Sequence, residues 1–357
     1  MNQRNSFFRP ELADLPAYVA GAGATEASVI KASSNEIPFP PLPGVQAAVM
    51  QQLGNITRYP DMAGTPLRAA IAAYHEVSME RVVVGNGSVA LIEKFLTALA
   101  VPDAEVVLPW PSFEAYPIAA KAAGVQAVRT KLRADGAVDL VAVRKAITPR
   151  TRAVLLCTPN NPTSAALTHA ELRAFLLELP SDIAVLLDEA YVDFVDMPDA
   201  VRGIELCEEF PNVISLRTFA KAYGLAGLRV GYAICQPEVA QTMLAVNTPF
   251  GVNQLAQSAA IAALQSRDEV DRRVQYIVAE RNKLVAALQA QGWKGQNPQG
   301  NFVWFADVNT ELLEMLCLAE GLVVRALPGG VRVTVTNPEG SLRLVRALSK
   351  YRSKQGN

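Results

Sequence analysis

The sequence predicts an α/β protein with a large domain built on a mostly parallel sheet and a smaller α+β domain. Amphipathic stretches of helical spacing alternate with five short apolar runs, which lie near residues 82, 106, 154, 185 and 214. Helical spacing dominates from Gln236 onward, and short strand-like runs return only after Gly292. Such alternation is typical of a parallel sheet, whose ligands bind beyond the carboxyl ends of its strands.

The two predicted domains differ in their local patterns. Residues 46–250 carry the alternating pattern and form the predicted large domain. Residues 1–45 are rich in proline and form an irregular arm, which we expect to join residues 251–357 in the small domain. Apolar residues at helical spacing predict one long helix from Gln254 to Gln291 that links the domains. Beyond it, NFVWFADV, LVVRAL and VRVTVTN predict strands, and the last stretch predicts a helix.

Composition argues for an ordinary enzyme-sized globular protein. The chain has 357 residues, half of them hydrophobic, so it can bury an ample core. A net charge of −1 and a pI near 6.2 make nucleic acid and anionic membrane surfaces poor partners. No apolar run approaches the roughly 20 residues that span a bilayer. The first residues, MNQRNSFFRPELADLP, lack the apolar core of a secretion signal, so we expect a cytoplasmic protein.

Cysteine and histidine usage narrows the possible chemistry. The four cysteines are far apart and form no CxxC pair, which favours reduced thiols in the core. With only His75 and His169 available, a Ser-His-Asp hydrolase or a histidine-ligated zinc site is nearly excluded, and no metal site is predicted. Acid–base chemistry must therefore come from carboxylates, tyrosine or lysine.

One lysine stands out in SLRTFAKAYGLAGLRVG, residues 215–231. Lys221 lies where an apolar run gives way to a small, polar turn, and Arg229 follows eight residues later. A poorly hydrated lysine has a lowered pKa, so its neutral amine can attack a carbonyl carbon. This position therefore predicts Schiff-base chemistry, whereas an arbitrary lysine in a loop would be solvated.

This stretch resembles the cofactor-lysine motif of fold type I aminotransferases that use pyridoxal phosphate (PLP), within the histidinol-phosphate and aromatic aminotransferase branch. The resemblance implies the PLP-transferase fold, with Lys221 holding PLP covalently. It also implies that Thr218 and Arg229 hold the phosphate group of the cofactor. A homodimer is expected on the same ground.

A second phosphate-binding element is predicted in RVVVGNGSVALIEKFL. Three valines form a buried strand, a glycine turn follows, and an amphipathic helix begins at Ser88. The free amides and the dipole at a helix N-terminus bind phosphate, so Gly87, Ser88 and Val89 form a predicted phosphate cradle. The rival interpretation, a dinucleotide site, lacks its GxGxxG pattern because Ala90 occupies the third glycine position.

The DEAY motif follows an apolar run, residues 183–187, and places Asp188 at the buried end of a strand. Burying a carboxylate is costly unless a cation pairs with it, and the protonated ring nitrogen of PLP is such a cation. Asp188 would keep that nitrogen protonated and so maintain the ring as an electron sink. The alternative is an edge carboxylate in water. The resemblance further implies that Tyr191 donates to the 3-oxygen of the ring.

Other site residues follow from the resemblance alone. Phe113 would stack on the cofactor ring, and Asn161 would contact the ring 3-oxygen and the substrate carboxylate. Arg332 would clamp the substrate α-carboxylate, for which a guanidinium is well shaped. Tyr59 of the RYP motif would cross to the other subunit and bind the phosphate of its PLP. Tyr18 is either a substrate-side tyrosine or a surface aromatic.

Several residues near these motifs keep two interpretations. Trp110 and Tyr116 could belong to the core or line the substrate site. Arg325 could bind a substrate phosphate, although a surface role is favoured, and Asn301 is a possible neighbour of Arg332. The family's usual NPTG is NPTS here, so Ser164 replaces a glycine and predicts a slightly different turn.

The resemblance implies transfer of an amino group between an aromatic, phenylalanine-like amino acid and 2-oxoglutarate, both small molecules. The link ALPGG before Val331 is shorter than in relatives that bind histidinol phosphate. A histidinol-phosphate aminotransferase is therefore only the second choice. A PLP lyase or decarboxylase is a rival interpretation, which would be favoured if Arg332 lay outside the pocket. A non-catalytic protein of this fold is another.

Overall fold

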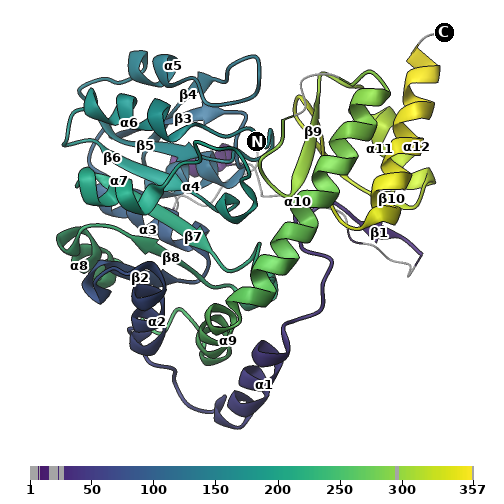
Figure 1. The fold of residues 1–357 in the computed structure, drawn as a ribbon. Helices are drawn as coiled ribbons and strands as arrows, with labels where there is room; N and C mark the ends of the chain where they lie inside the picture. The colour runs from purple at the N-terminus through teal and green to yellow at the C-terminus, as the bar shows by residue number, and fades with distance from the viewer. Residues whose placement is uncertain (1–6, 8, 16–22, 24–27, 294–296, 356–357) are drawn as a thin grey trace.

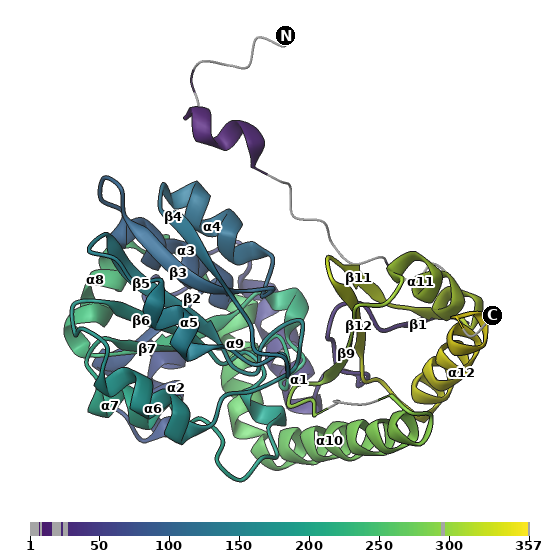
Figure 2. The same cartoon turned by 90° about the horizontal axis from the view of Figure 1, so that it is seen from above.

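The structure is a computed structural model that describes residues 7, 9–15, 23, 28–293 and 297–355. Two sheet-containing parts lie side by side and are bridged by one long helix, α10 (Arg267–Ala290), as Figures 1 and 2 show. The N-terminal described residues include a short 3₁₀ helix, η1 (Pro10–Asp14). No helix among the described residues is both long and apolar enough to cross a membrane.

The larger part is a seven-stranded sheet in which β8 alone runs antiparallel to its neighbours. In spatial order its strands are β2 (Val82–Gly85), β8 (Gly231–Ile234), β7 (Val213–Thr218), β6 (Ala184–Asp188), β5 (Thr151–Cys157), β3 (Glu105–Trp110) and β4 (Gln126–Lys131). The predicted open, mostly parallel α/β sheet is confirmed. Strand β8 was not predicted, and it pairs Gly231 with Thr218 of β7.

Helices cover both faces of this sheet because its central strands are apolar on both sides. Alternate residues of one strand point to opposite faces, so Leu155 packs with α3, α4 and α8, whereas Leu156 packs with α5, α6 and α7. The bounds of these helices are α3 (Ser88–Leu99), α4 (Ala115–Ala123), α8 (Pro237–Val246), α5 (Leu140–Lys145), α6 (His169–Leu177) and α7 (Gly203–Glu209). The short turns η3 (Met79–Arg81), η4 (Val192–Phe194) and η5 (Ala226–Leu228) join strands and helices.

The smaller part contains an antiparallel sheet of β11 (Arg325–Leu327), β12 (Gly330–Thr334) and β9 (Phe302–Ala306). Beside it, β1 (Ile30–Lys31) pairs in parallel with β10 (Leu322–Val323), which ties the N-terminal arm to the C-terminal region. The run LVVRAL therefore forms two short strands in two different sheets rather than one strand. Helices α11 (Thr310–Ala319) and α12 (Pro338–Gln355) complete this part. We propose that residues 46–250 form one domain and that the two flanking segments form the other.

The predicted long helix from Gln254 to Gln291 is wrong in one respect, because the chain breaks it at Ser266. Helix α9 (Gln254–Gln265) ends there and α10 begins in a new direction. The Ser266 hydroxyl donates to the carbonyl of Ala262, and such side-chain bonds compete with regular helix geometry. Helix α9 packs against α1 (Pro43–Gln52) and α2 (Thr65–His75). The short helix η2 (Leu53–Asn55) follows α1 in the sequence. Helix α10 crosses to the smaller sheet (Figure 2).

The two parts are also joined where the chain enters β9. Ser164 follows β5 with a φ of 63°, and its hydroxyl accepts a 2.9 Å hydrogen bond from the amide of Gly300. Its carbonyl accepts a 2.7 Å hydrogen bond from the amide of Gln299. The buried Arg281 of α10 donates to the carbonyls of Gly300 and Phe194. The serine that replaces the family's glycine therefore keeps a left-handed backbone and adds a bond between the two parts.

We expect Ser164→Ala to destabilise the protein more than Ser164→Gly. Alanine keeps the strained left-handed φ and leaves the buried Gly300 amide unpaired, which costs about 1–3 kcal/mol. Glycine also loses the hydroxyl but removes a backbone strain of about 1 kcal/mol. Urea unfolding of the two variants and the parent protein measures the difference. A Ser164→Ala protein as stable as the parent would contradict this account of the bond.

Candidate active site

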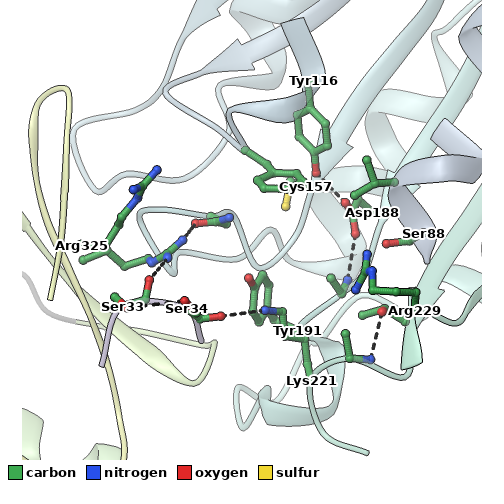
Figure 3. A pocket seen from close by; sticks show the side chains of 17 residues that line it. Ser33, Ser34, Ser88, Tyr116, Cys157, Asp188, Tyr191, Lys221, Arg229 and Arg325 are labelled. Atoms are coloured by element: carbon green, nitrogen blue, oxygen red, sulfur yellow. Dashed lines mark hydrogen bonds between the residues drawn. The ribbon is translucent and has the colours of Figure 1, made fainter. Parts of the chain in front are cut away.

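A cavity of about 190 Å³ opens between the carboxyl edge of the seven-stranded sheet and the smaller sheet (Figure 3). It gathers residues from both parts of the chain and from the N-terminal arm. Ten of the residues predicted for the site line it: Ser88, Val89, Phe113, Asn161, Asp188, Tyr191, Thr218, Lys221, Arg229 and Arg332. Strands β2, β3, β5, β6 and β7 end at this edge, which explains why motifs distant in sequence meet here.

Lys221 lies in the turn that follows β7, with its amine inside the cavity (Figure 3). Its Nζ donates to the carbonyls of Ser34 and Asn35, at 3.2 Å and 3.4 Å, and lies 5.4 Å from the ring centre of Tyr191. Burial, followed by the positive charge of Arg332, lowers the pKa of Lys221 to about 7. A large fraction of this amine is therefore neutral, and nucleophilic, near neutral pH.

Asp188 ends β6 at the floor of the cavity and is only 4% exposed. Its carboxylate accepts a 2.6 Å hydrogen bond from the Tyr116 hydroxyl and a 3.0 Å bond from the amide of Ala190. Burial raises the pKa of Asp188, while the bond from Tyr116 opposes that rise. A carboxylate held in this way is suited to receive a cation, because a cationic partner offsets the cost of burying its charge.

A cradle for an anion lies at the N-terminus of α3. Gly87 precedes it with a φ of 84°, and a Cβ at Gly87 would lie 2.7 Å from Nη2 of Arg229. The lack of a side chain thus lets the guanidinium approach the free amides of Ser88 and Val89. The Thr218 hydroxyl accepts from the amide of Ala220 at the same edge. Guanidinium, hydroxyl and helix amides form a donor set that suits a phosphate group.

These three features fit PLP as a unit. An amine with a lowered pKa can hold an aldehyde, a buried carboxylate can face a protonated ring nitrogen, and the cradle can take the phosphate. Figure 3 shows Lys221, Asp188 and Arg229 around one cavity. Phe113 lines the same cavity and packs edge-to-face against Tyr116, with ring centres 5.4 Å apart.

Arg332 reaches the cavity from β12 on the opposite side. Its guanidinium donates to Oδ1 of Asn161 at 2.6 Å and to the carbonyl of Ser33 at 2.7 Å. Asn301 is buried nearby and donates to the carbonyl of Asn35. Asn35 in turn donates to the Tyr191 hydroxyl at 2.9 Å. Burial raises the pKa of Tyr191, so its hydroxyl keeps a proton to donate.

One predicted site residue, Tyr59, lies elsewhere. Tyr59 is 83% exposed, outside the cavity, with its ring 4.6 Å from that of Phe250. Tyr18 lies outside the described residues. Trp110 does not line the cavity, and the Arg129 guanidinium lies over its ring.

The cavity also contains residues that the sequence analysis had not assigned to the site. Ser33 and Ser34 belong to the N-terminal arm. The sequence analysis left open whether Tyr116 belongs to the core or to the site. Tyr116 lines the cavity and donates to Asp188, so it belongs to the site. Cys157 carried no sequence signal. The favoured surface role for Arg325 is wrong, because its side chain is 11% exposed and lines the cavity.

Comparison with known proteins agrees with this geometry. A family profile described as "Aminotransferase class I and II" matches residues 27–348. The aromatic amino acid aminotransferase of Streptomyces avermitilis is 42% identical over 99% of this chain and 100% of that protein. The enzyme of the same name from Corynebacterium glutamicum strain R is 44% identical over 95% and 97%.

Among solved structures, the histidinol-phosphate aminotransferase of Sinorhizobium meliloti in complex with pyridoxal-5'-phosphate has a TM-score of 0.88. It is 26% identical and covers 99% of each chain. Thermus thermophilus aspartate aminotransferase with maleate has a TM-score of 0.79 at 25% identity, over 90% of this chain and 91% of that one. The predictions of an aminotransferase and of PLP as its cofactor are confirmed. This chain belongs to the class I and II aminotransferase family.

Proposed function

We propose that this aminotransferase exchanges the amino group of an aromatic, phenylalanine-like amino acid with 2-oxoglutarate. The observation that carries the proposal is the meeting of Lys221, Asp188, Arg229 and Arg332 around one cavity. The aromatic preference is supported by relatives of 42–44% identity that are named for aromatic amino acids. Arg332 lines the cavity, which favours a reaction that keeps the substrate carboxylate over the lyase or decarboxylase alternative.

The cofactor would be held by residues at three of its groups. Lys221 would bind the aldehyde, Asp188 the ring nitrogen, and the cradle of Gly87, Ser88, Val89, Thr218 and Arg229 the phosphate. Phe113 would cover the ring face, and Asn161 and Tyr191 would donate to its 3-oxygen. Bound PLP supplies an aldehyde that takes the amino group and a ring that stabilises negative charge at the substrate α-carbon.

The protein's own contribution is to orient the substrate and to move a proton. Arg332 would fix the α-carboxylate through two parallel hydrogen bonds, with Asn161 beside it. Nζ of Lys221 would accept the proton of the substrate α-carbon and later return it, because its pKa lies near neutral pH. Asp188 would stay ionised opposite a cationic nitrogen, since that charge offsets the burial that raises its pKa.

The dimer and the cellular location belong to the same proposal. Tyr59 is exposed next to the half-exposed Phe250, so its hydroxyl is available to a second subunit. We place its contact at the phosphate of the cofactor in the other subunit. The four cysteines are free and buried, which fits the reducing environment of a cytoplasm.

The rate at which apoenzyme captures added PLP should depend on the protonation of Lys221. Only the neutral amine attacks, so with a pKa of about 7 capture should be roughly tenfold slower at pH 6 than at pH 8 and level off above it. Stopped-flow absorbance of the visible band measures this rate. Lys221→Ala is the control and should give no such band. A rate that keeps rising to pH 10 would mean that the amine is not perturbed.

Substrate preference can be measured as a half-reaction. Loss of the visible band on mixing holoenzyme with phenylalanine, tyrosine, glutamate or histidinol phosphate reports each amino donor separately. We expect the two aromatic amino acids to react at least tenfold faster than histidinol phosphate. The opposite order would replace the proposed substrate by the histidinol-phosphate alternative and leave the aminotransferase activity unaffected.

Tyr59→Phe should weaken PLP binding while the protein remains a dimer. Loss of one hydrogen bond to a charged group, about 1.5 kcal/mol, raises the Kd roughly tenfold. Tyr276→Phe removes a hydroxyl from another partly exposed tyrosine and serves as the control. Fluorescence titration gives the Kd, and analytical ultracentrifugation gives the mass. A monomeric parent protein that binds PLP fully would exclude a contribution from a second subunit.

A further inference from the structure

An ion pair joins the two parts of the molecule beside the cavity. Nη2 of Arg325, in β11, lies 2.9 Å from Oε2 of Glu114, the residue that precedes α4. The Arg325 side chain is 11% exposed and the Glu114 side chain 33% exposed. In Figure 3, Arg325 lies on the side of the cavity opposite Asp188 and Arg229. Phe113, the residue before Glu114, lines the cavity as well.

Arg325 and Arg332 are direct partners in the register of β11 and β12. Residues that face each other in this way project to the same side of a sheet, and both arginines line the cavity. Like charges directly opposite each other repel, so the pair is favourable only when anions or carbonyl oxygens lie against both groups. One wall of the cavity thus offers two guanidinium groups side by side, and Arg325 already holds a carboxylate.

We propose that Glu114 is a specificity-determining residue that competes with substrate for Arg325. This inference rests on the proposed function, in which one cavity must accept a substrate with an uncharged aromatic side chain and a dicarboxylic one. With the aromatic substrate, Glu114 stays on Arg325 and neutralises it. With the dicarboxylic substrate, the α-carboxylate binds Arg332 and the distal carboxylate takes the place of Glu114 on Arg325.

The geometry makes this exchange feasible. A carboxylate already fits against Arg325, so another of the same size and charge can occupy that position. Glu114 is partly exposed, so after displacement its charge can turn to water, while the incoming carboxylate takes its place on the nearly buried Arg325. A dicarboxylate can bind Arg325 only when Glu114 has left it, so Glu114 reduces the apparent affinity for a dicarboxylate according to the fraction of time that Arg325 is available.

The test compares equilibrium binding of two unreactive ligands to the holoenzyme by calorimetry. Glutarate carries two carboxylates, and 3-phenylpropionate carries one carboxylate and an aromatic ring. We expect Glu114→Gln to tighten glutarate binding about three- to tenfold and to change 3-phenylpropionate binding less than twofold. Glu209→Gln removes the same charge from the ion pair with Arg173, away from the cavity, and should change neither.

Arg325→Gln provides the complementary variant. It should weaken glutarate binding at least tenfold, and adding Glu114→Gln to it should bring no further gain. Glu114→Gln that leaves glutarate binding unchanged, tightens both ligands equally, or still acts without Arg325 would overturn the proposal. Failure of 3-phenylpropionate to bind the parent enzyme would instead count against the aromatic substrate, because the glutarate measurements do not depend on it.

Discussion

The candidate site is arranged around one buried carboxyl group, that of Asp188. Asp188 ends the central strand β6, where its carboxylate is almost completely shielded from water, and burial alone would favour its neutral form. The Tyr116 hydroxyl, from α4, donates a hydrogen bond to the Asp188 carboxylate. The same carboxylate lines the cavity. A cationic ring nitrogen at this point would stabilise the ionised carboxylate, so the binding of the cofactor and the charge state of the protein are coupled.

The N-terminal arm completes the site with backbone atoms rather than with charged side chains. The carbonyls of Ser33, Ser34 and Asn35 accept hydrogen bonds from Arg332, Lys221 and Asn301. Each of these donors belongs to a different stretch of the chain. The arm is held in position by the pairing of β1 with β10. Cations from both parts of the molecule are therefore neutralised in part by carbonyl dipoles.

The sequence was most informative where a candidate site residue follows directly from a local pattern. Lys221 and Asp188 each come after an apolar strand, and Ser88 begins an amphipathic helix, so their meeting at one sheet edge could be predicted. Tyr116 and Arg325 could not be assigned, because their roles depend on contacts with Asp188 and Glu114 in distant segments. The helix break at Ser266 was missed for a related reason. The residues on both sides of Ser266 keep helical spacing, so the sequence pattern does not show the break. The hydrogen bond from the Ser266 hydroxyl becomes visible only in the structure.

The antiparallel strand β8 closes the segment that carries Lys221 and Arg229, the arginine proposed to bind phosphate. Thr218, the last residue of β7, is paired with Gly231, the first residue of β8, so the intervening segment is the loop of a hairpin. Such a loop closes on itself and needs no distant partner to define its ends. The spacing between Lys221 and Arg229 is consequently a local property of the large sheet. A rotation of the smaller sheet toward or away from the cavity would move Arg332 and Arg325 and leave this pair unaltered.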